Sequence, residues 1–258
     1  MKIVSFGGGV QSTALAILAA TGKIEVDAFV FCDTGFEQSI VFEFLEKHTL
    51  PLLNNVGIPF YTAKTEEHAG TLHGKTTFGN FLLPPFFHGD GDGDAKGRLP
   101  AFCSSKWKKD VFNKFCERQF KSKTYDVIMG FSTDEMHRAG RIKSSKKYRY
   151  QFPLLNFRMN RGDCVKLVQD AFNAPPPRSS CYFCPNHAQH EWREVMAGVD
   201  RDKVIAIDAK IRDSLSGYLN NKSHKAFLTV ECKPIADCDF DDKNEVIFSR
   251  LCAGGCFL

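Results

Sequence analysis

One group of residues near the start of the chain has the types and spacing to bind phosphate. Gly7, Gly8 and Gly9 follow a short apolar segment and precede a stretch that is typical of a helix. Because glycine has no Cβ atom, the backbone can adopt positive φ and approach an anion, while N–H groups at the helix start face that anion. We therefore expect a nucleotide phosphate here, and the candidate residues are Ser5, Gly7, Gly8, Gly9, Gln11, Ser12 and Thr13.

A second group has the spacing of metal ligands. Cys181 and Cys184 are separated by two residues, so two thiolates can bind one metal ion from a tight turn that Pro185 stiffens. With Cys103 they would supply three thiolates, enough for a [4Fe-4S] cluster with one open iron. Zinc held by the two cysteines with His187, His190, Cys103 or a cysteine near the end of the chain is the alternative, and a metal-free redox pair is a third. The spacing does not choose among them.

Two further cysteines, Cys252 and Cys256, lie in a glycine-containing segment almost at the end of the sequence. The glycines make this segment mobile enough to reach an active site, and a flexible pair of thiols is suited to exchange. Cys252 and Cys256 are therefore candidate catalytic residues. The alternative is a frayed terminus with idle thiols.

The elements that must position these residues alternate between strand and helix. Continuous apolar runs predict strands that are covered on both faces, as in a parallel sheet. The predicted strands are residues 2–6, 28–32, 59–61, 125–131 and 151–155, and the predicted helices are residues 12–20, 39–48, 105–120 and 161–172. We therefore predict an α/β fold, a Rossmann-like open parallel sheet of five strands with helices on both faces.

Two regions stand apart from this alternation. Residues 65–100 are dominated by glycine, histidine and proline, which predicts a flexible inserted loop. Residues 173–258 begin at three consecutive prolines and contain the Cys181–Cys184 pair, which predicts a small helical or irregular subdomain rich in cysteine. The predicted domains are therefore residues 1–172, a nucleotide-binding α/β domain that contains the insertion, and residues 173–258.

Ligands of open parallel sheets bind beyond the carboxyl ends of the strands, where the strand order reverses. The loops after the first, second and fourth predicted strands should therefore meet at one site. Besides the glycine run, these loops carry the candidate nucleotide-binding residues Asp33, Thr34, Gly35, Gly130, Phe131 and Asp134. Asp33 would lie near adenine or ribose or hold Mg²⁺, and its alternative is a turn or capping role.

In their order along the chain, these motifs resemble the PP-loop ATP pyrophosphatase superfamily, the adenine nucleotide alpha hydrolases with a HUP-type fold. Within it they are similar to the phosphoadenosine phosphosulfate (PAPS) reductase-like branch. The matching segments are residues 7–12, 33–37, 130–138 and 152–154. Gly7 replaces the serine of the usual SGGxDS pattern and Gln11 replaces its aspartate, so a side chain expected near metal or pyrophosphate is neutral here.

The resemblance implies an enzyme that binds ATP, or a related adenine nucleotide, with Mg²⁺. A substrate oxygen would attack the α-phosphorus and release pyrophosphate, and sulfur or another nucleophile would then displace AMP. The substrate would be a nucleobase in nucleic acid or a small molecule. Because this chemistry needs positioned positive charge, Lys106 and Arg138 are further candidate catalytic residues.

Two other functions stay open. In a sulfonucleotide reductase, a cysteine near the end of the chain would attack the sulfate sulfur of PAPS or of its unphosphorylated analogue, and a thioredoxin-like reductant would recycle the enzyme. The PAPS reductase-like resemblance favours this function. The remaining alternative is a non-catalytic module that binds nucleotide or nucleic acid and carries a structural metal.

Charge and composition narrow the partners and the compartment. A formal net charge of +4 does not indicate nucleic acid, but basic residues gather at 106–109 and 138–149 with interleaved aromatic residues. A tRNA or DNA substrate would explain more of these cations than ATP requires. No apolar run approaches the ~20 residues of a membrane span and no signal peptide is recognised, so we expect a cytoplasmic protein without membrane contact. The ten cysteines then suit metal binding or thiol chemistry rather than disulfides. The oligomeric state is not indicated.

Overall fold

A computed structural model describes residues 1–64, 71–77, 79–215 and 224–241. Their contacts divide the chain into two units. The described residues of the first unit are 1–64 and 107–179, and those of the second unit are 71–77, 79–106, 180–215 and 224–241. No helix in these ranges is long and apolar enough to cross a membrane.

The first unit is built on a sheet of five parallel strands, which confirms the predicted fold class. The spatial order is β3-β2-β1-β8-β9. The strands are β1 (Lys2–Phe6), β2 (Ala28–Cys32), β3 (Phe60–Ala63), β8 (Tyr125–Met129) and β9 (Tyr148–Gln151). The chain leaves β1 to one side for β2 and β3 and returns to the other side for β8, so the strand order reverses between β1 and β8. That reversal marks the crevice in which such sheets bind ligands.

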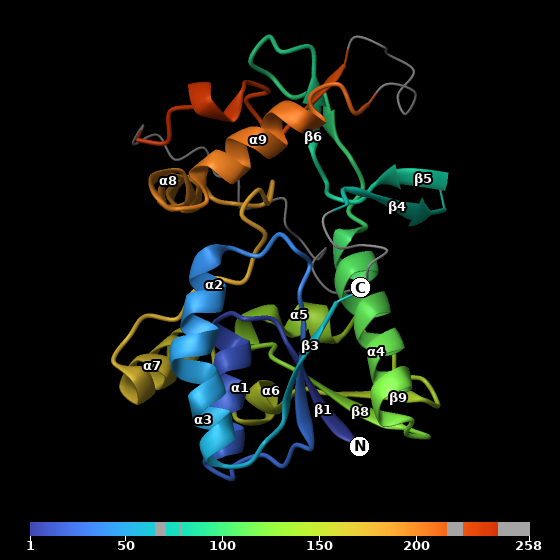
Figure 1. Cartoon of the computed structure of the whole chain (residues 1–258), viewed down its shortest axis with the longest axis vertical. Coiled ribbons are helices and arrows are strands. Elements are labelled where there is room, and N and C mark those ends of the chain that lie inside the picture. The colour runs from blue at the N-terminus through green and yellow to red at the C-terminus, as the bar shows by residue number, and fades with distance from the viewer. Residues whose placement is uncertain (65–70, 78, 216–223, 242–258) are drawn as a thin grey trace. The chain divides into compact units, whose positions relative to one another are not determined.

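Helices cover both faces of this sheet (Figure 1). One face packs against four helices: α1 (Val10–Ala20), α2 (Ser39–Phe44), α3 (Leu50–Asn55) and α7 (Arg161–Phe172). The other face packs against α4 (Asp110–Phe120). Because β2 lies between these two layers, all five of its residues are buried, which explains its unbroken apolar sequence.

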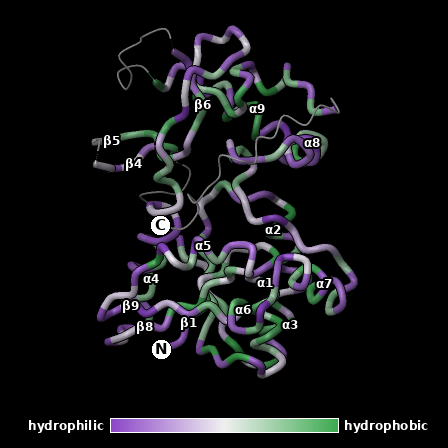
Figure 2. The backbone as a smooth tube through the Cα atoms, turned by 180° about the vertical axis from the view of Figure 1, so that it is seen from behind, coloured by the Kyte–Doolittle hydropathy of each residue, from purple (hydrophilic) through white to green (hydrophobic). Residues whose placement is uncertain are grey.

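The hydrophobic residues of the first unit gather in the sheet and in the helix faces that cover it (Figure 2). On β1, Val4 and Phe6 pack toward α1, whereas Ile3 packs toward α4. Successive strand residues point to opposite faces, so each strand contributes to two cores. Figure 2 shows a hydrophilic stretch leading into β9, in keeping with the serines and lysines of residues 143–147.

Several predicted boundaries shift. The fifth strand, predicted at residues 151–155, lies at Tyr148–Gln151, because Pro153 starts the short helix α6 (Pro153–Asn156). The second predicted helix continues beyond residue 48, since a π-helical turn at Leu45–Thr49 joins α2 to α3. A π-helical turn at Ser104–Lys109 likewise precedes α4.

The second unit contains two small antiparallel sheets. Its strands are β4 (His73–Thr76), β5 (Gly79–Leu82), β6 (Phe87–Gly89), β7 (Gly97–Arg98) and β10 (Lys225–Phe227), and its helices are α8 (Gln189–Ala197) and α9 (Arg201–Ile211). Residues 65–100, predicted as a flexible inserted loop, contain four of these strands among the residues that the structure describes, β4 to β7. Strand β6 pairs with β10, whose residues lie far along the chain, and buries Phe87 against Phe227 and Cys232.

Candidate nucleotide site

The loop that joins β1 to α1 requires glycine at its centre. Gly8 has φ of +80°, and a Cβ atom there would lie 2.5 Å from Cγ1 of Val41. Real Cβ contacts are never this short, and positive φ is strained for other residues. The glycine loop, residues 7–9, therefore makes a tight turn at the amino end of α1, where no side chain would fit at Gly8.

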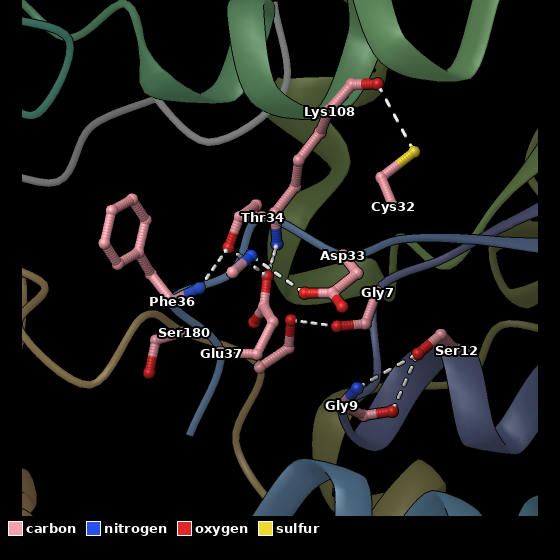
Figure 3. Close-up of polar contacts among 12 residues, drawn as sticks. Gly7, Gly9, Ser12, Cys32, Asp33, Thr34, Phe36, Glu37, Lys108 and Ser180 are labelled. Carbon is pink, nitrogen blue, oxygen red and sulfur yellow. Dashed lines mark hydrogen bonds and ion pairs between the residues drawn. The ribbon is translucent and has the colours of Figure 1, made fainter. Parts of the chain in front are cut away.

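The first residues of α1 close this loop from inside. The Gly9 N–H donates to Ser12 Oγ at 3.1 Å, and the Ser12 hydroxyl donates to the Gly9 carbonyl at 2.9 Å (Figure 3). The Thr13 hydroxyl donates to the same carbonyl at 3.0 Å. Both hydroxyls thus stabilise the loop in this structure. The remaining N–H groups of the first helical turn have no acceptor within the helix, so a helix start of this kind can donate to an anion.

Ser179 lies directly against the glycine loop. Its hydroxyl donates to the carbonyl of Gly7, and a Cβ atom on Gly9 would lie 2.8 Å from Ser179 Cβ and 2.9 Å from Ser179 N. Gly9 is therefore required by close approach of a second backbone segment. Sequence reasoning missed Ser179, whose position just before the Cys181–Cys184 pair was the signal that could have pointed to it.

The loop after β8 meets the start of α1. A Cβ atom on Gly130 would lie 3.0 Å from the carbonyl carbon of Gln11 and 3.1 Å from Ser12 N. The predicted convergence of these two loops at the strand reversal is confirmed. The convergence extends to β2, because Phe31 lies 3.5 Å from the position of a Cβ atom on Gly8.

Gln11 takes part in a polar network with this loop. Its Nε2 donates to Glu135 Oε2 at 3.0 Å, and its Oε1 accepts from Arg161 at 3.4 Å. The carboxylate of Asp134 accepts from the Arg161 N–H at 2.5 Å and from Ser132 Oγ at 3.3 Å. An aspartate at position 11 would face the Glu135 carboxylate, whereas the amide of Gln11 donates to it, which gives a physical reason for the neutral residue.

Phe131 and Arg138 contact each other and pack against neighbouring side chains. The guanidinium of Arg138 lies 4.6 Å from the centroid of the Phe131 ring and pairs with Glu135. The Phe131 ring is buried and stacks on Phe152 with centroids 5.6 Å apart. The side chain of Phe131 therefore belongs to the core, and its backbone is the part that borders the site.

The loop after β2 holds two buried carboxylates, each with a lysine. Asp33 accepts from the Gly35 N–H at 2.8 Å and pairs with Lys64 at 2.7 Å. Glu37 Oε1 lies 3.2 Å from the Nζ atom of Lys108 (Figure 3). The predicted turn role of Asp33 is thus realised. Its ion pair involves a lysine whose side chain is 64% exposed.

The two carboxylate oxygens of Glu37 differ in their hydrogen bonds. Thr34 Oγ1 donates to Oε1 at 3.2 Å, whereas Oε2 is buried and accepts from no group in the described part of the chain. A buried carboxylate oxygen without a donor is costly unless a ligand or a cation satisfies it. With Asp33, Glu37 therefore offers the oxygen ligands that Mg²⁺ prefers.

Cys32, immediately before this loop, is not a reactive thiol. It is buried, its Sγ lies 3.5 Å from the carbonyl oxygen of Lys108, and burial raises its pKa to about 12. A thiol with so high a pKa is a packing residue.

The four predicted metal ligands, Cys103, Cys181, Cys184 and His187, all belong to the second unit. The Cys184 N–H donates to the carbonyl of Cys181 at 3.0 Å, so the pair spans a tight turn as predicted. His187 is buried, with Nε2 2.9 Å from Ser180 Oγ and its ring 4.6 Å from that of Trp192. Across the described residues, no three His, Cys, Asp or Glu side chains form a group that could hold a metal ion.

This arrangement does not provide the three-cysteine site that a [4Fe-4S] cluster requires, so we derive no reaction step through a cluster. The metal site stays a prediction of the sequence. Two of the predicted catalytic residues, Cys252 and Cys256, lie outside the described residues. Lys106 belongs to the second unit and Arg138 to the first.

No protein-family model matches the chain, and neither does any curated protein. Among solved structures, it is similar to the U34-tRNA thiolase NcsA from Methanococcus maripaludis, determined with its [4Fe-4S] cluster. The similarity covers 86% of this chain and 67% of the thiolase chain, with 13% sequence identity and a TM-score of 0.40. A similarity at this level indicates neither the substrate nor the cofactor of this chain.

Proposed function

We propose that the first unit binds ATP or a related adenine nucleotide at the glycine loop and transfers the adenylate group to an acceptor oxygen, as a PP-loop enzyme. One observation carries the proposal: the loop geometry that excludes every side chain at Gly8 lies at the start of α1, where the strand order reverses. Such a site combines backbone donors with the positive end of a helix.

Phosphate binding would use the backbone of the loop. The N–H groups of the first turn of α1 would donate to the phosphate oxygens, and Ser179 would hold the Gly7 carbonyl away from the anion through its hydrogen bond. Gly130, which packs on Gln11 without a Cβ atom, leaves room for the nucleotide to approach this end of the sheet.

Charge at the site would be balanced by the loop after β2. Asp33 and Glu37 are the residues that would hold Mg²⁺, which supplies charge neutralisation for the departing pyrophosphate. Lys64 and Lys108, now paired with these carboxylates, would be released toward the phosphates when Mg²⁺ takes their place.

In the proposed reaction, an acceptor oxygen forms a bond to the α-phosphorus of ATP. The bond between the α-phosphorus and the bridging oxygen breaks, and pyrophosphate leaves with the electron pair. The second step, in which sulfur or another nucleophile forms a bond to the acceptor carbon and AMP leaves, belongs to the same proposal. Assignment to the PAPS reductase-like branch rests on the sequence motifs.

Pyrophosphate release from ATP tests the proposal. We expect the protein to release pyrophosphate in the presence of RNA or DNA acceptors. When no nucleophile is supplied for the second step, label from α-³²P-ATP should stay on the acceptor. Asp33→Asn should lower the rate at least tenfold, whereas the exposed Asp170→Asn on α7 should not change it. Sulfite release from PAPS without pyrophosphate release from ATP would instead establish the reductase, and the absence of both products would overturn the enzymatic proposal.

A further inference from the structure

A cavity of about 240 Å³ lies within the first unit, on the face of the sheet that α4 covers. The glycine loop leads into α1, which covers the opposite face. Two residues that line the cavity also border the candidate nucleotide site. Ser5 lines the cavity two positions before the glycine loop, and Lys108 lines it while pairing with Glu37.

The inner part of the cavity is apolar. Phe112, Val127 and Met129 line it and are buried, with exposed fractions of 4%, 2% and 7%. The half-buried ring of Tyr150 lines it from β9, and burial raises the pKa of the Tyr150 hydroxyl, which therefore stays neutral. A flat, uncharged ring is the kind of group that such a lining accommodates.

The outer part of the cavity is positively charged. Lys109, Arg141 and Lys143 line it and are exposed, and no acidic side chain is among the described residues that line it. These cations come from the two basic stretches that the sequence showed separately, one at the start of α4 and one before β9 (Figure 2). The fold therefore brings both stretches to one opening.

An apolar interior with a cationic opening suits a flat ring joined to phosphate. About 240 Å³ is below the ~300–1,000 Å³ of pockets for drug-sized ligands, which limits the occupant of the cavity to one nucleobase or a group of similar size. Three exposed cations at the opening, with Lys146 continuing the same segment, exceed what one phosphodiester needs. Successive phosphates of a strand would account for them.

We propose that this cavity receives one nucleotide of a single-stranded nucleic acid, whose base stacks on the Phe112 and Tyr150 side of the cavity and whose phosphates contact Lys109, Arg141 and Lys143. This inference rests on the proposed function in one respect, that the nucleotide held here is the acceptor of the adenylate group. Binding of the strand itself does not depend on ATP.

Fluorescence anisotropy with a 5′-fluorescein single-stranded RNA of 12 nucleotides, and a DNA of the same sequence, tests the inference without ATP. The double variant Arg141→Glu/Lys143→Glu should bind at least tenfold more weakly than the wild type. The control Lys23→Glu/Lys123→Glu changes the charge equally at exposed lysines outside the cavity and should retain most of the affinity. Loss of two phosphate contacts should also flatten the slope of log K against log salt by about 1.4.

A second pair of variants tests the interior. Tyr150→Ala should weaken binding about tenfold, and Tyr150→Phe should restore it, because stacking needs the ring and not the hydroxyl. Thermal melts of each variant show whether it is folded. The inference would be overturned if Arg141→Glu/Lys143→Glu and Lys23→Glu/Lys123→Glu lost the same affinity for the strand. It would also be overturned if Tyr150→Ala bound RNA and DNA as tightly as the wild type.

Competition and ATP binding distinguish the remaining outcomes. If AMP or UMP displaces the strand at concentrations comparable with the strand's own, the cavity binds a free nucleotide and the strand proposal is overturned. If ATP binding is lost in Arg141→Glu/Lys143→Glu and is unaffected by Gly8→Ala, the cavity is the ATP site and both proposals fail. If ATP does not bind at all while strand binding depends on the cavity, the proposed function fails and this site stands.

Discussion

The Nζ atom of Lys108 lies 3.2 Å from Oε1 of Glu37, whose side chain is completely buried. The pair joins the turn before α4 to the loop after β2, so one ion pair holds together two segments that border the candidate site. Because the lysine side chain is 17% exposed, this pair is shielded from solvent far more than a surface salt bridge.

Lys108→Met should destabilise the first unit by about 3 kcal/mol, because it leaves the Glu37 carboxylate buried without a cation. Urea unfolding followed by circular dichroism measures the change. Lys109→Met is the matched control, since Lys109 lies next to Lys108 in the sequence but is exposed. The double variant Glu37→Gln/Lys108→Met should recover much of the loss, and equal stability of the Lys108 and Lys109 variants would contradict the buried pair.

Gln11→Glu should destabilise the protein in a pH-dependent way. The new carboxylate would face Glu135, with which the Gln11 amide now makes a hydrogen bond of 3.0 Å. Repulsion raises the folded-state pKa of such a pair above its unfolded value, so the folded state binds more protons and the variant loses stability as pH rises. We expect the drop in Tm relative to wild type to be larger at pH 7.5 than at pH 5; equal drops would contradict this contact.

Cys32 should resist alkylation in the folded protein. Its pKa of about 12 reduces the thiolate fraction at pH 8 roughly 1000-fold relative to an ordinary thiol, and burial limits access further. Mass spectrometry after brief iodoacetamide treatment should find Cys32 unmodified until denaturant is added. Rapid labelling of Cys32 without denaturant would show that β2 is not covered as described.

The sheet could be predicted from the sequence because its strands are short apolar runs bounded by turn residues, as in residues 2–6 and 28–32. The meeting of the glycine loop with Gly130 was also predictable, since parallel strands place their following loops at one edge. The polar contacts were not. Lys108 reaches Glu37 only because α4 packs on β2, and nothing local to either residue indicates the other.

The strands of the second unit could not be predicted for a related reason. Strand β6 has three residues and pairs with β10, which lies more than one hundred residues later, so its pattern is too short and its partner too distant to recognise. The glycine-rich composition of the region then favoured a loop. Ser179 was missed because only the fold brings it against the glycine loop, and a serine just before the Cys181–Cys184 pair does not by itself indicate that contact.

Metal binding by Cys181 and Cys184 stays a prediction, and anaerobic purification with metal analysis checks it. We expect bound metal to be lost in Cys181→Ser/Cys184→Ser and retained in Cys238→Ser, which alters a half-buried thiol outside the pair. Absorption in the iron–sulfur region would identify a cluster, and a colourless protein with stoichiometric zinc would identify zinc. A wild-type protein without metal would contradict the prediction.

Calorimetric titration of ATP tests the central claim most directly, with Gly8→Ala compared against Gly140→Ala. A Cβ atom at Gly8 would lie 2.5 Å from Val41, whereas one at Gly140 comes no closer than 3.9 Å to the atoms around it. The account predicts that the wild type and Gly140→Ala bind ATP equally and that folded Gly8→Ala binds at least tenfold more weakly. Ser179→Ala, which adds no bulk, should also weaken binding. A wild-type protein that does not bind ATP, or a Gly8→Ala variant that binds it as tightly as the wild type, would contradict the account.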